Sequence, residues 1–249
     1  MEHEVRSRLV RHQSPPLKFQ RNQVMKRQSI ICYGTGKFAE LIHFYLSSEE
    51  GQDVVGFVAD KVYIRDRTFL GLPVRAFEEV ESFWNPADFY MILAVGYRMM
   101  RNRKRMYDDA KGKGYRLANF VSKKATLADN VVMGDNNIVM PHVHVEPFSV
   151  IGNNNIFWSN TLICHHARIG HHNFFAPNST IAGDATIGDL CFFGVGSVIR
   201  DKLFIADETH VVPGSAVYNN TSAHMKYVGV PARPVRQHLE KGIVIRPRT

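Results

Sequence analysis

The apolar positions between residues 127 and 217 recur at every sixth residue without a break. The series consists of Leu127, Met133, Val139, Val145, Ile151, Phe157, Ile163, Ile169, Phe175, Ile181, Ile187, Phe193, Ile199, Ile205, Val211 and Val217. A period of six fits neither an α-helix nor the two-residue alternation of a simple strand. The pattern therefore predicts a solenoid whose short strands each contribute one apolar residue to a shared interior.

Small residues flank this series. The residue two before an apolar position is often Ser, Thr or Ala, as at Ser149 and Ala167, and the residue after it is often Gly or Ala. If three six-residue units make one triangular coil, residues 18 apart stack at about the 4.8 Å spacing of neighbouring strands. We therefore expect an all-β solenoid of parallel coils over residues 121–222. A β-sandwich is the alternative fold, but it does not require so strict a period.

Residues 28–120 show a different pattern, in which short apolar runs alternate with amphipathic segments. Strands are predicted at 29–33, 53–60, 72–74 (an edge strand) and 90–95, and helices at 39–48, 77–84 and 99–113. This alternation predicts a small α/β domain of the Rossmann-like type. Fewer than a hundred residues is small for a dinucleotide-binding domain, so the pattern favours a mononucleotide and argues against a nicotinamide oxidoreductase.

A glycine-rich turn follows the first predicted strand. Gly34, Gly36 and Lys37 precede a helix, an arrangement that holds phosphates at a helix N-terminus, although such a turn also simply lets a helix pack close to its strand. Asp60 ends the second long strand, where nucleotide-binding folds place an acid for the ribose, and Gly96 follows the strand at 90–95. These five residues are the predicted nucleotide-binding set.

The two ends of the chain lie outside both patterns. Residues 1–27 are polar and basic and are expected to form a flexible extension. Residues 223–249 are expected to form a tail with a short helix at 236–241, after the run Val228-Gly229-Val230-Pro231-Ala232-Arg233 ends the regular coil.

Composition narrows the classes of partner. The chain has 249 residues, 45% of them apolar, which is enough to bury the cores of two domains. Its net charge of +8 is concentrated at the two ends, without the interleaved aromatic residues that nucleic-acid binding requires, so anionic small molecules are the expected partners. We expect no membrane span, no signal peptide and a cytoplasmic location. Cys32, Cys164 and Cys191 are an odd set without close pairing, which argues against disulfides.

Together, the small α/β domain, the six-residue repeat and the closing run Val228-Gly229-Val230-Pro231-Ala232-Arg233 resemble nucleotide-sugar acetyltransferases of the sialic acid O-acetyltransferase and bacillosamine N-acetyltransferase type. The resemblance covers about residues 28–235. It implies a left-handed parallel β-helix, a homotrimer with acetyl-CoA as co-substrate between neighbouring coils, and no metal. It also implies that the N-terminal domain holds a nucleotide-linked sugar and that the product serves bacterial surface polysaccharides. The acceptor is an amine or a hydroxyl, and the likeness to aminosugar enzymes favours the amine.

Acyl transfer from a thioester needs a base, and histidine is the natural base near neutral pH. The densest group of histidines is His165, His166, His171 and His172. In the resembled family, a catalytic His is followed by an acid and then by Ile-Gly, and aligning Ile169-Gly170 places His165 on the base and His166 on the acid. A histidine does not carry the permanent negative charge of a carboxylate, so three alternatives are open. His165 is oriented by another group, or His165 and His166 share a proton, or His166 is the base.

The six-residue register supports His165, which lies two residues after the inward-facing Ile163 at a coil corner. One coil later this corner holds Gly183, a candidate backbone donor to the thioester carbonyl. In some family members a second His, nine residues after the base, contacts the acyl group. That position is Phe174 here, so the role is vacant or filled by His171 or His172.

Coenzyme-binding positions follow from the resemblance in the same register. They are Gly183, Val195, Gly196, Ser197, Pro213 and Gly214, with Arg200, Lys202 and Arg233 as candidate partners of phosphates. The turns of a six-residue repeat also need small residues without any ligand, and this is the alternative explanation for the glycines.

Two other function classes remain open from the sequence. The γ-class carbonic anhydrases also use a six-residue solenoid, and His166 and His171 have the spacing of two of their zinc ligands, but the third ligand position is Asn130. A non-catalytic trimeric scaffold that binds a sugar nucleotide is the other alternative. Metal content and acyl-CoA turnover discriminate these classes.

Overall fold

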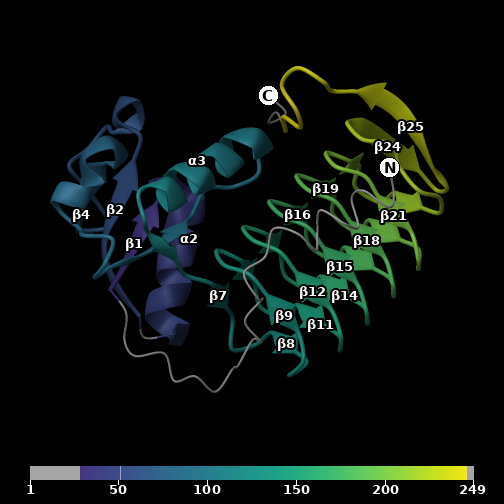
Figure 1. The fold of residues 1–249 in the computed structure, drawn as a ribbon, viewed down its shortest axis with the longest axis horizontal. Helices are drawn as coiled ribbons and strands as arrows, with labels where there is room; N and C mark the ends of the chain where they lie inside the picture. Colours follow the sequence, from purple (N-terminus) through teal and green to yellow (C-terminus); the bar gives the residue numbers. More distant parts are fainter. Residues whose placement is uncertain (1–28, 51, 246–249) are drawn as a thin grey trace.

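The structure is a computed structural model that describes residues 29–50 and 52–245. The predicted extension over residues 1–27 therefore lies outside the described residues. An N-terminal α/β unit packs against one face of a long stack of coils, and a C-terminal hairpin ends the stack (Figure 1). None of the helices in the described ranges is long and apolar enough to cross a bilayer.

The α/β unit is built on a six-stranded sheet with the order β3-β4-β2-β1-β5-β6. Its strands are β1 Ser29–Tyr33, β2 Asp53–Ala59, β3 Thr68–Phe69, β4 Leu72–Ala76, β5 Tyr90–Leu93 and β6 Arg116–Leu117. Its helices are α2 Lys37–Tyr45, which ends in the π-helical turn η1 Leu46–Glu50, α3 Met100–Gly112, and the 3-10 helices η2 Lys61–Tyr63 and η3 Phe77–Ser82. All strand pairs are parallel except β3 with β4.

Two details of this unit differ from the sequence prediction. The strand predicted at the edge, β4, lies between β2 and β3, because the turn at Leu70-Gly71 folds β3 back against it. The helix predicted over 77–84 is the 3-10 helix η3. Its three-residue period places Phe77 and Val80 together against the sheet, where both are buried.

The β-helix has three sheets of two-residue strands. The first sheet contains β7 Phe120–Val121, β10 Ile138–Val139, β13 Ile156–Phe157, β16 Phe174–Phe175, β19 Phe192–Phe193 and β22 His210–Val211, and continues into β24 Met225–Gly229 and β25 Ala232–Gln237. The second contains β8 Thr126–Leu127, β11 His144–Val145, β14 Leu162–Ile163, β17 Thr180–Ile181, β20 Val198–Ile199 and β23 Ala216–Val217. The third contains β9 Val132–Met133, β12 Val150–Ile151, β15 Arg168–Ile169, β18 Thr186–Ile187 and β21 Phe204–Ile205.

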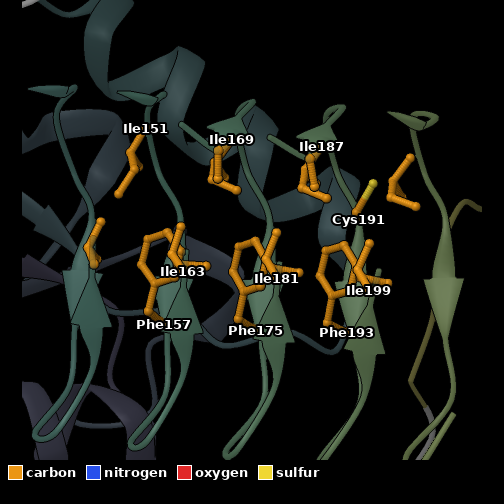
Figure 2. Packing of buried hydrophobic residues seen from close by; sticks show 14 of the residues in the cluster. Ile151, Phe157, Ile163, Ile169, Phe175, Ile181, Ile187, Cys191, Phe193 and Ile199 are labelled. Carbon is orange, nitrogen blue, oxygen red and sulfur yellow. The ribbon is translucent and has the colours of Figure 1, made fainter. Parts of the chain in front are cut away.

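The six-residue series forms the interior of these coils. All sixteen predicted positions are buried and belong to one apolar cluster. Strands pair in parallel at 18-residue intervals, so Ile163 lies opposite Ile181, and the rings of Phe157 and Phe175 stack with centroids 4.7 Å apart. Figure 2 shows these columns of like residues. The predicted solenoid and its three-sided coil are therefore confirmed.

One edge of the β-helix carries a ladder of polar side chains, which we call the Asn155 edge (residues 134–137, 152–155, 170–173, 188–191 and 206–209). Buried amides bond from coil to coil: Asn155 donates its backbone N–H to Asn137 Oδ1 at 3.0 Å, and Asn173 donates to Asn155 Oδ1 at 2.9 Å. These bonds satisfy turn N–H groups that burial would otherwise leave without partners.

The α/β unit and the β-helix form one continuous structure. Ile42 of α2 and Phe57 of β2 belong to the same apolar cluster as Ile156 and Phe174, on the outer face of the first β-helix sheet. On the Asn155 edge, the fully buried Arg103 of α3 donates to the carbonyls of Asn154 and His172, each at 2.5 Å, and to that of Asn173 at 3.1 Å. These hydrogen bonds from its guanidinium thus go to backbone carbonyl oxygens rather than to a carboxylate.

The C-terminal helix predicted at 236–241 is wrong. Arg236 and Gln237 end strand β25, which pairs antiparallel with β24, and residues 239–241 form a turn. Gln237 pairs with Met225 and Arg236 with Lys226, and this pairing keeps both residues extended. The chain then runs along the loop before α3, where Ile245 N–H donates to the Arg98 carbonyl at 3.1 Å (Figure 1).

Replacing Arg103 with Met is expected to lower the free energy of unfolding by about 3 kcal/mol, because the carbonyls of Asn154 and His172 would lose their donor, whereas that of Asn173 keeps the Ile156 N–H. Urea unfolding of the purified protein measures this effect. Lys104→Met is the matched control on the same helix. It removes an exposed pair with Asp108 and is expected to change stability by less than about 0.5 kcal/mol. Equal effects of the two substitutions would contradict the stabilising role of the hydrogen bonds from Arg103 to the β-helix.

A second prediction concerns acid stability. Burial, reinforced by the charge of Arg103, lowers the pKa of His172 to about 2, so the folded protein keeps this imidazole neutral. The unfolded chain protonates it below its ordinary pKa of about 6.5. His172 therefore lowers the free energy of unfolding by about 2 kcal/mol between pH 8 and pH 5.

His172→Asn removes this proton uptake and extends the amide contact of Asn136 with Asn154 by one coil. The melting temperature of the variant should consequently fall less between pH 8 and pH 5 than that of the parent. His43→Asn, on α2 rather than on the Asn155 edge, is the control. If the melting temperature of the His172 variant fell between pH 8 and pH 5 as much as that of the parent, His172 would not be the source of the acid sensitivity.

Candidate active site

Two further edges of the β-helix carry the predicted site residues. The His165 edge (residues 146–149, 164–167, 182–185 and 200–203) connects the second sheet to the third, and the Val195 edge (residues 158–161, 176–179, 194–197 and 212–215) connects the first sheet to the second. The two edges border the same face, which is the second sheet.

The imidazole of His165 lies against the backbone of Gly183. A Cβ at residue 183 would lie 2.6 Å from Cε1 and 2.9 Å from Nε2 of His165, so any side chain there would displace the ring. Strand pairing of Leu162 with Thr180 confirms the predicted one-coil register between the two residues. Within the described ranges, the Gly183 N–H has no hydrogen-bond acceptor, which leaves it available to a ligand.

His166 is the direct partner of the His165 ring. The two Nδ1 atoms are 3.1 Å apart, within hydrogen-bond distance, and the rings meet edge to face. The other side of the His166 ring stacks on Phe148, with centroids 4.7 Å apart. Glu146 also reaches this edge, but its carboxylate accepts the backbone N–H of His165 at 2.7 Å.

The other two histidines of the dense group lie on the Asn155 edge. His171 Nδ1 accepts the Asn153 N–H at 3.0 Å, and His172 Nδ1 lies 2.9 Å from Asn154 Nδ2. Both rings are therefore rungs of the polar ladder, and neither stands near His165 in this chain. The prediction that the role left open by Phe174 is vacant or filled by His171 or His172 stays a prediction. His166 and His171, the pair with zinc-ligand spacing, lie on different edges.

The predicted coenzyme residues fall into two groups. Gly183, Arg200 and Lys202 lie on the His165 edge, and Arg233 lies in β25. The remaining residues lie on the Val195 edge: Val195, Gly196, Ser197, Pro213 and Gly214. Val195 is 49% exposed, and no atom lies within 4 Å of a Cβ built at Gly196 or Gly214. Both of these glycines have positive φ, which their turns require without any ligand. Ser197 is buried.

A groove of about 580 Å³ begins at the Val195 edge and extends over the first sheet. Val195 and Pro213 line it together with Trp158, Phe174 and Phe192. Tyr97 of the β5–α3 loop reaches over the sheet, with its ring centroid 4.5 Å from that of Phe174. The groove therefore lies where the α/β unit meets the coils.

The groove ends at His210 and Lys226, which pair across neighbouring strands. Burial, and then the charge of Lys226, lowers the pKa of His210 to about 4, so this imidazole is neutral near pH 7. Sequence reasoning missed both residues and Trp158. The available signal was the column of Ile156, Phe174, Phe192 and His210, which are 18 residues apart on the outward side of the first sheet.

The glycines of the α/β unit differ in what surrounds them. A Cβ at Gly34 would lie 2.7 Å from the Ala94 carbonyl oxygen, and the φ of this residue is +136°, so packing alone requires glycine there. No atom lies within 4 Å of a Cβ built at Gly36 or Gly96, and Lys37 is exposed. Phe38, which follows Lys37, contacts Trp158 with centroids 5.9 Å apart, so the turn lies beside the groove.

Asp60 is already engaged inside the α/β unit. Its carboxylate accepts the Tyr33 hydroxyl and Arg105 Nη2, the latter at 2.7 Å. Burial and this hydrogen bond raise the pKa of Tyr33 above its ordinary value. A ribose hydroxyl would have to compete with these partners for Asp60.

Comparisons with known proteins agree with this architecture. The family described as bacterial transferase hexapeptide (six repeats) matches residues 130–165 and 166–201. None of the curated proteins matches the sequence. PerB from Caulobacter crescentus, solved in complex with CoA and GDP-perosamine, is 24% identical, with a TM-score of 0.76 over 85% of this chain and 99% of its own.

Two further solved structures are similar. The acetyltransferase domain of PglB from Neisseria gonorrhoeae is 20% identical, with a TM-score of 0.75, covering 84% of this chain and 100% of that domain. WeeI from Acinetobacter baumannii is 21% identical, with a TM-score of 0.71 and the same coverage. These chains share one fold. The expected left-handed parallel β-helix with an N-terminal α/β unit is thereby confirmed.

Proposed function

We propose that the protein is an acetyl-CoA-dependent acetyltransferase that acts on an amino group of a nucleotide-linked sugar. The observation that carries the proposal is the His165 imidazole, seated on Gly183 beside a free backbone N–H at an exposed edge. The fold shared with PerB, which was solved with CoA and GDP-perosamine, supports it. PglB, of similar fold, was also solved with acetyl coenzyme A.

The division of the site residues between two edges supports a homotrimer. One chain does not bring the His165 edge and the Val195 edge together, because the second sheet lies between them. If neighbouring copies place these edges side by side, the groove of one chain opens toward His165 of the next. Exposed apolar residues, Val195 and Val198, suit such a contact.

We assign nucleotide binding to residues 28–120 and acyl transfer to residues 121–222. The open space at Gly36 and Gly96, with Lys37 beside it, suits a diphosphate, and the adjoining groove suits the sugar. The coenzyme would run along the Val195 edge, with Arg233 of the hairpin near its phosphates. We place the enzyme in the cytoplasm and its product in surface polysaccharide synthesis.

The chemistry follows from the His165 edge. Acetyl-CoA supplies a thioester, whose carbonyl carbon accepts the new bond from the amine. His165 Nε2 takes the proton that the amine loses as the bond to carbon forms. The Gly183 N–H donates to the developing oxyanion. When the carbon–sulfur bond breaks, His165 returns the proton to the leaving thiolate.

The test is a thiol-release screen of acetyl-CoA against nucleotide-linked 4-amino and 3-amino sugars, with the matching hydroxyl sugars as controls. His165→Asn is expected to lower kcat at least about 100-fold, because the base is lost while the shape is kept. The melting temperature and CoA binding should stay unchanged. Residual activity within a few-fold of the parent would move the base to His166. Binding of a nucleotide-linked sugar without any turnover of acetyl-CoA would favour the alternative function, a non-catalytic trimeric scaffold.

Gly183→Ala keeps the His165 imidazole but changes where it lies, so it tests the position of the base. The added methyl would overlap the His165 ring, so we expect a roughly 10- to 100-fold loss of kcat by misplacement of the catalytic group. Gly112→Ala is the control, since no atom lies within 4 Å of its Cβ. A Gly183→Ala enzyme with parental kcat would show that His165 does not act from its observed position.

A further inference from the structure

Stability does not explain why a phenylalanine stands at position 148. It has a φ of +65° and is 59% exposed. A bulky side chain in this left-handed region costs about 1 to 2 kcal/mol, and an exposed ring recovers little of that by burial. At the equivalent turn position of the Val195 edge the chain uses Asn160 and Asn178, which tolerate positive φ well.

The contacts of Phe148 run to the proposed base. Its ring stacks on His166, one coil later, with an angle of 27° between the planes, and His166 Nδ1 is 3.1 Å from His165 Nδ1. The His165 ring in turn lies on Gly183. Phe148, His166, His165 and Gly183 thus form one continuous line of contacts along the His165 edge.

The Glu146 carboxylate reaches this edge but does not bond to an imidazole nitrogen. It accepts the backbone N–H of His165 at 2.7 Å. Among the described residues, no carboxylate oxygen hydrogen bonds to either imidazole. Within residues 29–50 and 52–245, the only hydrogen-bond partner of the His165 ring is therefore another imidazole.

We propose that Phe148 and His166 are a positioning pair that orients the base in place of a carboxylate, an inference that rests on the proposed function. The stack on Phe148 fixes the His166 ring so that its Nδ1 lone pair is directed at His165. His165 then carries its proton on Nδ1 and donates this N–H to His166 in a hydrogen bond. This leaves the Nε2 lone pair, on the side of Gly183, free to take the proton from the acceptor amine.

Phe148→Asn tests the pair without creating strain. We expect kcat to fall about 10-fold or more while KM for both substrates changes less than two-fold. The melting temperature should stay the same or rise, because Asn tolerates this φ better than Phe does. A merely structural role predicts the opposite, a lower melting temperature with unchanged kcat, and that result would overturn the proposal. Phe44→Ala, a control of similar exposure (61%) on α2, should leave kcat unchanged.

Double substitutions show whether Phe148 acts through His166. In a His166→Ala background, Phe148→Asn should cause no further loss of kcat, because the ring it orients is absent. His166→Glu should retain most of the parental kcat, since a carboxylate accepts the same hydrogen bond. In this His166→Glu background, Phe148→Asn should change kcat by less than about two-fold. Independent, multiplicative effects of the two substitutions would refute the pair.

A measurement without turnover separates this inference from the proposed function. Diethyl pyrocarbonate modifies the unprotonated ring nitrogen of histidine, and peptide mass spectrometry gives the rate at His165, with His43 as the reference. His166→Ala and Phe148→Asn should slow this rate at least about five-fold, and equal rates in all variants would refute the pair. If the parent releases no thiol with any amino sugar but these rates still fall, the proposed function fails while the pair stands.

Discussion

The parallel backbone pairing of each coil with the next is the constraint on which the rest of this structure depends. It places every residue above the one 18 positions earlier, at the spacing shown by the 4.7 Å between the rings of Phe157 and Phe175. Identical environments therefore repeat along the prism. Apolar residues stack inside, amides stack at the Asn155 edge, and the residues near His165 are those one coil before and after it.

This repetition explains why much of the fold could be predicted from the sequence. The burial of every sixth residue is a local rule, so the interior from Leu127 to Val217 and the stacking of His165 on Gly183 both followed from counting. The same counting did not reveal what outward side chains meet. The groove depends on how Tyr97, from the α/β unit, approaches Phe174, and no period in the sequence encodes that approach.

The sequence did not show which tertiary partners the polar side chains meet. His171 and His172 lie close to His165 along the chain, but a turn of the prism carries them to the next edge, where the ladder uses them as hydrogen-bond acceptors. Asp60 fits a nucleotide-binding pattern, and its carboxylate also accepts hydrogen bonds from Tyr33 and Arg105, which the pattern does not encode. The helix predicted at 236–241 is wrong because pairing with β24 holds its first residues extended.

The apolar cluster shared by α2, β2 and the first β-helix sheet has a consequence for how such proteins diversify. Since Ile42 and Phe174 lie in one core, the unit beside Gly36 cannot swing open as an independent lid. A chimera that exchanged only this unit would meet a foreign surface at Ile156, Phe174 and Phe192. Recombination at the junction near Phe120 should therefore succeed only when those outward columns are exchanged with it, which ties the evolution of the two halves together.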